Sequence, residues 1–469
     1  MNPRPEKLHI LLLSIHGLIR GHDLELGRDA DTGGQTKYVV ELARFLGRNP
    51  HVGQVDLMTR RVVDPQVGPD YAEVVEPLAE GVRIVRIDCG EEGYIPKEDL
   101  WDHLDSFADN ALNFLRAEDA YPHLVHSHYA DAGYVGTVLA GQLGVPLVHT
   151  GHSLGRVKRR RLLAGGLGSE QLENKYRMSR RIAAEEMTLS CADLVVTSTR
   201  QEVEAQYVLY DYYLPKQKRV IPPGVDLDRF FPPVGDEKDQ PIHGELLRFL
   251  AEPDKPMILA LSRPDHRKNL TALLAAYGRN EELKAKANLV LVAGTRDDVQ
   301  EMDAGSREVI QEILLAVDRH DLYGKAAYPK FHRPEEVPVF YRLAAASGGV
   351  FVNPALTEPF GLTLLEAAAS GVPIAATEDG GPTDIIANCR NGELIDPLDT
   401  EDIGAALLRI LDDPNRWRKL AANGLDGVRR HYSWKAHTEA YVEEILPLVS
   451  GTPQAVRPEP RQWSGRFRD

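Results

Sequence analysis

Short apolar runs recur along the chain, and stretches with helical spacing separate them. The first series comprises residues 8–15, 55–60, 82–87, 124–129, 146–152 and 193–199. The second series comprises residues 257–263, 288–294, 326–332, 349–355 and 372–377. A strand buried on both faces reads as a continuous apolar run, and a helix between two strands implies that they pair in parallel. The pattern therefore predicts doubly wound α/β structure.

A segment rich in proline, glycine and charge, residues 221–245, lies between the two series. We predict an N-terminal Rossmann-like domain over residues 1–225 and a second Rossmann-like domain over residues 226–440. Residues 441–469 should form a C-terminal helix and tail, which we allow to cross back to the first domain. Two doubly wound sheets that face each other enclose a deep cleft, lined by the loops that follow the strands.

The composition argues against several classes of protein. A formal net charge of -15 is unlike a general nucleic-acid-binding surface. Cys89, Cys191 and Cys389 are too few and too far apart for a disulfide framework or a paired metal site. No apolar stretch approaches the roughly 20 residues that cross a bilayer, and the first run lacks the cleavage site of a signal peptide. We expect a cytoplasmic protein that binds neither nucleic acid nor a membrane.

A glycine pair, Gly33 and Gly34, comes shortly after the first run and opens an amphipathic stretch that begins near Gln35. Taken alone, the pair favours a plain turn from strand to helix. Alternatively, glycine lets the amides at the start of the helix approach an anion or a reacting oxygen closely. Neither a dinucleotide fingerprint nor a phosphate-binding P-loop motif is present.

Basic side chains gather after the run at 146–152. Lys158 follows that run, and Arg177, Arg180 and Arg181 fall on a predicted helix. Basic groups that converge on one point suit the phosphate of a small molecule, whereas the alternative is a solvated basic face. Because the whole chain is acidic, we favour phosphate binding.

The second half repeats this placement of charge. Arg263 and Lys268 follow the run at 257–263 and stand on either side of a Pro-Asp-His turn, so both can reach a diphosphate. Glu358 and Glu366 are separated by seven residues between a strand and the sequence "SGVPI". The first glutamate should sit in a loop at a helix start and the second one or two turns along that helix, where each can hydrogen-bond a different sugar ring.

Two Asp-x-Asp triplets occur, at Asp29 and Asp31 and at Asp226 and Asp228. The first precedes the glycine pair and the second lies in the segment between the domains. We interpret all four aspartates as turn residues and expect no catalytic metal.

The motifs together resemble the retaining glycosyltransferases of GT-B architecture. The segment "SRPDHRKN" and the pair Glu358 and Glu366 belong to this wider resemblance. More narrowly, "DTGGQTKYVVELAR", "GYIPKEDLW", "HSHYADAGYV", "TGHSLGRVK", "RRIAAEE", "IPPGVD" and "EPFGLTLLEAAASG" resemble the sucrose-phosphate synthase family. The resemblance extends from about residue 8 to about residue 435. It implies a minimal catalytic form, in which we see neither a long regulatory extension nor a phosphatase-like domain.

The resemblance implies roles for individual residues. Those implied to be catalytic are Arg263, Lys268, Glu358, which would bind the glucose hydroxyls, and His152, which would contact the donor glucose. Those implied to bind the acceptor or the transferred sugar are Gly33, Gly34, Gln35, Lys97, Tyr129, Ser153, Lys158, Arg180 and Arg181. Those implied to bind the nucleotide are Arg263, Lys268, Leu365 and Glu366, the last through the ribose. The sequence leaves open which of Arg180 and Arg181 faces the acceptor phosphate.

The implied reaction is transfer of glucose, with retention, from UDP-glucose or ADP-glucose to fructose 6-phosphate, giving sucrose 6-phosphate. Arg263 and Lys268 would stabilise the departing diphosphate, so the chemistry needs neither a cofactor nor Mg²⁺. A separate sucrose-phosphate phosphatase is an expected partner. The alternatives are a related transferase, such as a mannosylfructose-phosphate or glucosylglycerate-type synthase, and a non-catalytic sensor of sugar nucleotides.

Overall fold

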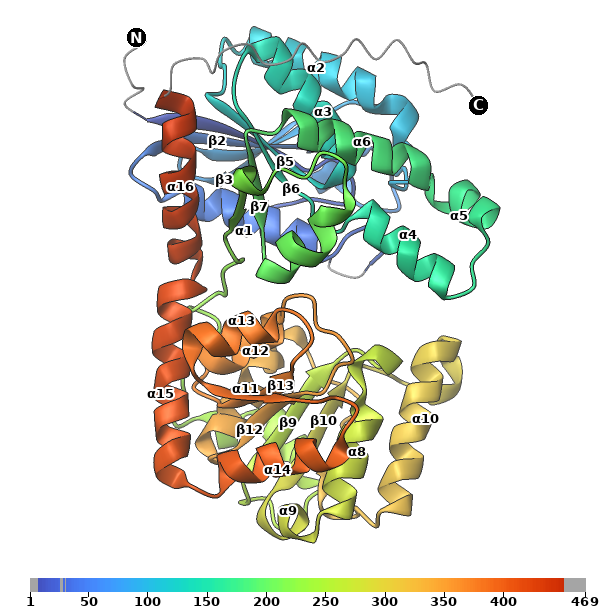
Figure 1. The fold of residues 1–469 in the computed structure, drawn as a ribbon, viewed down its shortest axis with the longest axis vertical. Coiled ribbons are helices and arrows are strands. Elements are labelled where there is room, and N and C mark those ends of the chain that lie inside the picture. The colour runs from blue at the N-terminus through green and yellow to red at the C-terminus, as the bar shows by residue number, and fades with distance from the viewer. Residues whose placement is uncertain (1–6, 26–27, 30, 451–469) are drawn as a thin grey trace. The chain divides into compact units, whose positions relative to one another are not determined.

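The computed structural model describes residues 7–25, 28–29 and 31–450, so the predicted tail from residue 451 lies outside the described residues. The chain divides into two compact units. The first runs to Ile221 and takes up the chain again from His437, and the second is Pro222–Ala436. The helix that we expected from residue 441 begins earlier, at Trp434, and is α16 (Trp434–Ser450) in Figure 1.

In the described part of the first unit, eight strands form one sheet in the order β3-β4-β2-β1-β5-β6-β7-β8. They are β1 (Leu8–Leu13), β2 (Val52–Arg60), β3 (Val75–Ala79), β4 (Val82–Ile87), β5 (Leu124–His128), β6 (Leu147–Thr150), β7 (Leu194–Thr197) and β8 (Lys218–Val220). All neighbours pair in parallel except β3 with β4. β3 and β8 were not predicted, since both are edge strands with mainly exposed or half-exposed residues.

Helices follow the strands of the first unit. They are α1 (Gly34–Gly47), α2 (Leu104–Ala117), α3 (Tyr129–Leu143), α4 (Gly155–Ala164), α5 (Ser169–Tyr176), α6 (Met178–Cys191) and the greater part of α16. Buried side chains of α2, α3 and α6 pack with Leu11, Leu13 and Val125 in one hydrophobic core, and these helices cover one face of the sheet (Figure 1). α1 contacts β2 with an apolar side that includes Val39, Leu42 and Leu46.

In the described part of the second unit, six parallel strands form a sheet in the order β11-β10-β9-β12-β13-β14. They are β9 (Met257–Ser262), β10 (Asn288–Ala293), β11 (Ala326–Ala327), β12 (Val350–Asn353), β13 (Ile374–Thr377) and β14 (Gly392–Ile395). β14 was not predicted, because it has only four residues and three of them are exposed or half-exposed.

Alternation along these strands builds two cores, one on each face. Leu259 and Phe351 belong to one core, whereas Ile258 and Val350 belong to the other, as expected when successive side chains point to opposite faces. The helices are α7 (Pro241–Leu247), α8 (Leu270–Arg279), α9 (Glu281–Lys286), α10 (Ala304–Arg319), α11 (Val337–Ala346), α12 (Leu362–Ala369), α13 (Pro382–Cys389), α14 (Thr400–Leu411) and α15 (Pro414–His431). The predicted pair of doubly wound, Rossmann-like sheets is confirmed.

Both sheets reverse their strand order at their first strand. β1 lies between β2 and β5, and β9 lies between β10 and β12. The loops after β1 and β5, and those after β9 and β12, therefore leave in opposite directions and open a crevice at the carboxyl ends of these strands. The glycine pair follows β1, the segment that carries Lys158 follows β6, Arg263 and Lys268 follow β9, and Glu358 follows β12, whereas the segment that carries Lys97 follows β4.

Two observations bear on the classes of protein considered above. Among the described residues, no helix is both long enough and apolar enough to cross a membrane. Cys89, Cys191 and Cys389 are free thiols, the first and third buried.

Asn269 fastens three loops of the second unit together. It ends the turn that carries Lys268 and adopts a left-handed conformation, with φ 53°. Its side-chain amide donates to the carbonyl of Pro354, at 3.1 Å, and to that of Pro397, at 2.7 Å. Asparagine is one of the few side-chain-bearing residues that tolerate this conformation, so a single residue fixes both the backbone and the loop contacts.

Asn269→Ala should lower the free energy of unfolding of the second unit by about 2–4 kcal/mol, because it removes two hydrogen bonds and strains the backbone. Asn269→Gly keeps the backbone conformation and should recover only the strain part of that loss. Chemical denaturation followed by tryptophan fluorescence measures both. Equal stability of the alanine variant and the unsubstituted chain would contradict the assignment.

Candidate functional site

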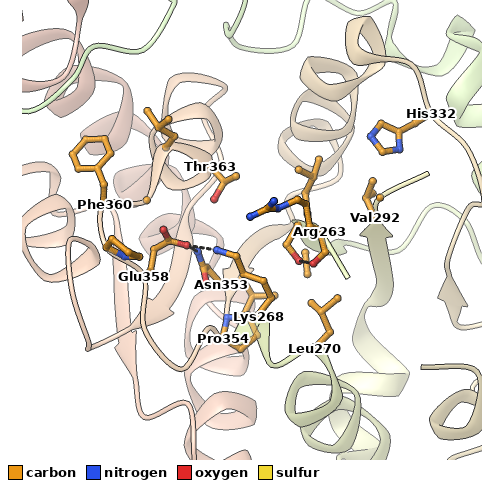
Figure 2. A pocket seen from close by; sticks show the side chains of 18 residues that line it. Arg263, Lys268, Leu270, Val292, His332, Asn353, Pro354, Glu358, Phe360 and Thr363 are labelled. Atoms are coloured by element: carbon orange, nitrogen blue, oxygen red, sulfur yellow. Dashed lines mark hydrogen bonds and ion pairs between the residues drawn. The ribbon is translucent and has the colours of Figure 1, made fainter. Parts of the chain in front are cut away.

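A cavity of about 510 Å³ opens at the carboxyl ends of β9, β10 and β12, within the second unit. Arg263, Lys268 and Glu358 all line it, so the structure brings together three residues predicted from separate motifs (Figure 2). The first two follow β9 and the third lies in the loop between β12 and α12.

Two side chains hold the carboxylate of Glu358. Lys268 Nζ donates to its Oε2 at 2.7 Å, and Asn353 Nδ2 donates to the same oxygen at 3.0 Å (Figure 2). Its backbone exchanges hydrogen bonds with Asp379 and Gly381. The other oxygen, Oε1, accepts no hydrogen bond from a described residue, which leaves it available to a hydroxyl of a ligand.

Positive charge lines the same cavity. The guanidinium of Arg263 is exposed, donates no hydrogen bond to a described residue, and points toward Thr363 (Figure 2). Thr363 lies in the first turn of α12, which Gly361 enters with φ 103°. The amides of Leu362 and Thr363 have no acceptor among the described residues. A helix N-terminus with free amides beside an arginine and a lysine is suited to a diphosphate.

Glu366 and Leu365 do not line this cavity. Glu366 lies in the second turn of α12, as predicted, and accepts a hydrogen bond from the hydroxyl of Tyr341 at 3.0 Å. Leu365 has no exposed side-chain surface and packs in the core. Its side chain is therefore buried away from a bound nucleotide, and contact through its main chain stays a prediction.

In the first unit, Arg181 rather than Arg180 faces the predicted acceptor residues. Arg181 is 3 % exposed, and its Nη2 donates to the carbonyl oxygen of Ser153 at 2.7 Å and to Ser153 Oγ at 3.3 Å. Its guanidinium lies 4.5 Å from the ring centroid of Tyr129. Arg180 instead pairs with Asp102 at 2.5 Å, away from this group. Arg177 precedes α6 as its N-cap rather than lying on the helix.

A buried carboxylate fixes Arg181. Glu185 accepts from Arg181 Nε at 3.0 Å, from the amide of Gly155 at 3.0 Å and from the hydroxyl of Tyr210 at 2.5 Å. Gly155 is the first residue of α4, which carries Lys158. The hydrogen bond from the Gly155 amide to Glu185 therefore joins α4 to α6, the two helices that bear the basic side chains.

The Lys158 amine lies 4.1 Å from the ring centroid of Tyr176 and has no carboxylate partner among the described residues. Its partial burial, with repulsion from Arg181 and Lys97, lowers the pKa of Lys158 to about 8, despite opposing attraction from Glu98 and Asp31. A lysine in such surroundings gains most from a bound anion, because the anion supplies the missing negative charge.

Lys97 forms an ion pair with Asp31, which also accepts hydrogen bonds from the amide of Lys97 and from the hydroxyl of Tyr94, both at 3.0 Å. The interpretation of Asp31 as a turn residue is therefore wrong: it fastens the loop at 94–97 to the glycine-pair loop. Asp29, by contrast, accepts from the amides of Asp31 and Thr32, as a turn residue does.

Asp226 likewise accepts from the amides of Asp228 and Arg229, which confirms a turn there. Among the described residues, no group of three or more His, Cys, Asp or Glu side chains is arranged to hold a metal ion.

His152 follows β6 in a left-handed conformation, with φ 54°. Its Nε2 lies 3.0 Å from His128 Nδ1, at the end of β5, and its ring packs edge-on against Tyr38 with centroids 5.0 Å apart. The ring is exposed beyond these contacts. Tyr129, next to His128, also has a positive φ, 78°. Strained backbone at both strand ends is typical of a functional site, because surrounding structure must hold it in place.

The glycine pair starts α1, with Gly33 as N-cap and Gly34 as first residue. A Cβ added at either position would meet no atom within 4 Å, so space above the helix start is open. The amides of Gly34, Gln35 and Thr36 have no acceptor among the described residues. The side-chain amide of Gln35 donates to Ser14 Oγ at 3.1 Å and to the carbonyl of His128, which anchors the helix start to the ends of β1 and β5.

Sequence reasoning missed three contributors. Asn353 ends β12 and holds Glu358, the amides of α12 face the first cavity, and Glu185 holds Arg181. The Gly361 that enters α12 was a usable signal, since glycine after a loop commonly marks a positive φ. Nothing in the sequence indicates that Glu185 faces inward.

Comparison with known proteins covers both units. A model of Glycosyltransferase Family 4 matches residues 32–229, and a model described as Glycosyl transferases group 1 matches residues 246–426. The chain is 45 % identical to sucrose-phosphate synthase 4 of Arabidopsis thaliana over 93 % of its length, which is 47 % of that protein. The chain thus spans about half the length of the curated relatives that it matches.

Solved structures agree with this match. Sucrose-phosphate synthase from Thermosynechococcus elongatus superposes with a TM-score of 0.70 and 29 % identity, over 95 % of this chain and all of that one. HepE from Anabaena, in complex with UDP and glucose, has the same fold with a TM-score of 0.60 and 14 % identity. The predicted GT-B architecture is confirmed.

Inorganic phosphate should bind the unit that carries Lys158 with an affinity that falls about tenfold per pH unit above 8, since only the protonated amine attracts the anion. Below pH 8 the amine is charged and affinity should level off. Lys158→Arg, which stays charged, should remove the decline up to pH 10. Isothermal titration calorimetry from pH 7 to pH 10 measures the affinity for phosphate. An unchanged affinity over this range in the unsubstituted chain would contradict the lowered pKa of Lys158.

Proposed function

Because the chain belongs to the sucrose-phosphate synthase family of glycosyltransferases, we propose that it transfers glucose with retention from a nucleotide sugar to fructose 6-phosphate. The product is sucrose 6-phosphate, and the nucleoside diphosphate leaves. One observation carries the proposal within the wider fold class. Lys158 lacks a carboxylate partner and lies near the buried Arg181, at the ends of strands that also bear Tyr129 and Ser153.

The arrangement in the first unit suits a phosphorylated sugar. Arg181 is fixed in direction by Glu185, so its remaining N–H groups meet a phosphate without a loss of side-chain freedom. Lys158 adds a flexible second charge. Such a pair discriminates against an unphosphorylated acceptor, because Lys158 would then be left without an anion.

The arrangement in the second unit suits the donor. Glu358 offers a free oxygen to glucose hydroxyls, and Arg263, Lys268 and the amides of α12 face the position of a diphosphate. We propose that Glu366 binds the ribose, for which it would exchange or share its bond from Tyr341.

The bond from the anomeric carbon to the diphosphate oxygen breaks, and a bond from that carbon to the acceptor oxygen forms on the same face. The acceptor proton passes to the departing diphosphate oxygen. Positive charge grows on the sugar and negative charge on the diphosphate. Arg263, Lys268 and the α12 amides stabilise that negative charge, and we propose that this makes a metal ion unnecessary.

Three finer assignments belong to the same proposal. The donor is UDP-glucose or ADP-glucose, as the family resemblance implies. A separate phosphatase would release free sucrose. We propose a cytoplasmic location, which suits three free thiols. A non-catalytic sensor is disfavoured, since Arg263, Lys268 and Glu358 are all present and assembled.

Incubation of the purified chain with fructose 6-phosphate and each of UDP-glucose, ADP-glucose, GDP-glucose and GDP-mannose, with and without EDTA, tests the proposal. We expect a disaccharide phosphate, identified by mass spectrometry and by digestion with a phosphatase, at the same rate with EDTA. Product formed from glycerate in place of fructose 6-phosphate would favour a glucosylglycerate-type synthase. Binding of the donor without any product would favour a sensor.

Arg263→Ala and Lys268→Ala should each lower kcat by about 10²-fold or more, as does loss of an oxyanion donor. Lys268→Ala should be the more severe, because it also releases Glu358. Arg267→Ala is the matched control, since Arg267 is a neighbouring exposed arginine that pairs with Asp265 instead. Steady-state kinetics measure kcat for the three variants. Near-normal turnover in both Arg263→Ala and Lys268→Ala would refute their role in stabilising the departing diphosphate.

Lys158→Ala should raise the KM for fructose 6-phosphate by about tenfold or more, the scale of a lost charge-assisted contact, with little change in the KM for the donor. Arg159→Ala, an exposed neighbour on the same helix, serves as the control. Equal effects of Lys158→Ala on the two substrates would refute acceptor binding.

Gly34→Val should leave folding intact but abolish transfer. An added side chain meets no atom of the protein, whereas it would occupy the space above the free amides of α1. Gly141→Val is the matched control, because Gly141 is an exposed glycine of α3 whose added Cβ also meets open space. Thermal unfolding should be alike in the two variants. Normal turnover in Gly34→Val would show that Gly33 and Gly34 serve only as a turn from strand to helix.

A further inference from the structure

A second cavity, of about 690 Å³, lies elsewhere in the second unit. It is bounded by α7, α10 and the loop from Tyr328 to Arg333, and it has no lining residue in common with the cavity of Arg263. Its volume falls within the roughly 300–1,000 Å³ typical of sites for small molecules.

One wall of this cavity is aromatic. The rings of Phe249 and Tyr328 pack with centroids 4.9 Å apart. Phe331 is 59 % exposed and Leu314 is 38 % exposed, and both line the cavity. A planar or apolar group of a ligand would remove this surface from water.

The charged groups of the lining do not balance. Arg248 pairs with Glu245 at 2.6 Å, and Arg333 pairs with Glu336 at 3.2 Å. The remaining cation at the rim, Lys330, donates only to a backbone carbonyl, that of Asp297 at 3.2 Å. The two carboxylates in the lining are therefore engaged by two of its four cations.

Arg296 is the fourth cation, and it is buried, with 9 % exposure. Its Nη1 and Nη2 donate to the carbonyls of Pro329 and Tyr328, both at 3.2 Å, and its Nε has no partner. Neutral carbonyls orient a guanidinium but do not neutralise it. A buried cation without a counter-charge is costly, and burial lowers the pKa of Arg296 accordingly. An anion in the cavity would supply the missing charge.

We propose that this cavity is a second ligand site, which takes a phosphate ester with a planar or apolar organic part. The phosphate lies by Arg296 and Lys330, because a guanidinium and an ammonium together suit its geometry and charge. The organic part lies on the wall formed by Phe249, Tyr328 and Phe331. The proposal concerns binding alone and stands apart from the transfer reaction.

Binding here must be separated from binding at the two substrate positions. Lys330, Phe331 and Arg333 line the second cavity, whereas His332 between them lines the first. The full chain with Lys158→Ala lacks the lysine proposed to bind the acceptor phosphate. This variant is titrated calorimetrically with phenyl phosphate in the presence of saturating UDP, which occupies the donor position. Inorganic phosphate is titrated in parallel as the ion without an organic part.

Leu314→Trp fills the cavity from an exposed position on α10, so folding should be preserved. Leu315→Trp is its control, since Leu315 is 61 % exposed on the same helix and does not line the cavity. Lys330→Gln removes one charge. We expect one binding event for phenyl phosphate that Leu314→Trp weakens by about tenfold or more, that Lys330→Gln weakens several-fold and that Leu315→Trp leaves unchanged.

Inorganic phosphate should bind about tenfold more weakly than phenyl phosphate, because it cannot use the aromatic wall. Equal binding of the two would overturn the assignment to an ester. Absence of binding at about 10 mM, where even a very weak site would fill, would overturn the site itself. Competition between UDP and phenyl phosphate, or equal affinity in the two tryptophan variants, would assign the binding to the first cavity and also refute the proposal.

Discussion

Parallel pairing at the first strand of each sheet is the constraint on which the rest of the molecule depends. β1 pairs with both β2 and β5, and β9 pairs with both β10 and β12. Because the connecting helices go to opposite faces, the loops that follow these strands diverge and leave backbone amides and charged side chains uncovered. The glycine pair of α1 and the Arg263 cavity are two results of the same topological rule.

Within the first unit, a buried ion pair between Arg181 and Glu185 fixes the direction of the Arg181 guanidinium. Arg181 and Glu185 do not add much stability, since desolvation offsets most of their attraction, although removing one partner would cost about 3–5 kcal/mol. The value of the pair is positional. Glu185 on α6 accepts hydrogen bonds from Arg181 of the same helix and from the amide of Gly155 at the start of α4, so it holds together the two helices that bear the basic groups.

The fold could be predicted from the sequence because buried parallel strands are apolar throughout, and this signal located both sheets. The strands that were missed, β3, β8 and β14, are short and exposed in part. Their position depends on a neighbouring strand rather than on local composition. Periodicity therefore finds the centre of a sheet more readily than its edge.

Some residues of the candidate site could likewise be predicted from the sequence, and others could not. Arg263, Lys268 and Glu358 could be grouped because each lies in a segment that connects the end of a strand to the next helix. Arg180 and Arg181 could not be told apart, since adjacent helical residues point about 100° from each other and only packing decides which faces inward. Asp31 was misread because turn chemistry and ion pairing use the same carboxylate, and its partner Lys97 lies 66 residues away.

The path of α16 has a consequence for how the protein is made. This helix leaves the second unit and completes the first, where the ring of Tyr441 stacks on that of His126 with centroids 5.2 Å apart. Residues up to 221 emerge from the ribosome well before residue 441, so the first unit waits for the second to be synthesised before its core is closed. During that interval His126 and its neighbours lack the ring that covers them. The second unit, which is continuous in sequence, can fold first, contrary to the usual order from the N-terminus.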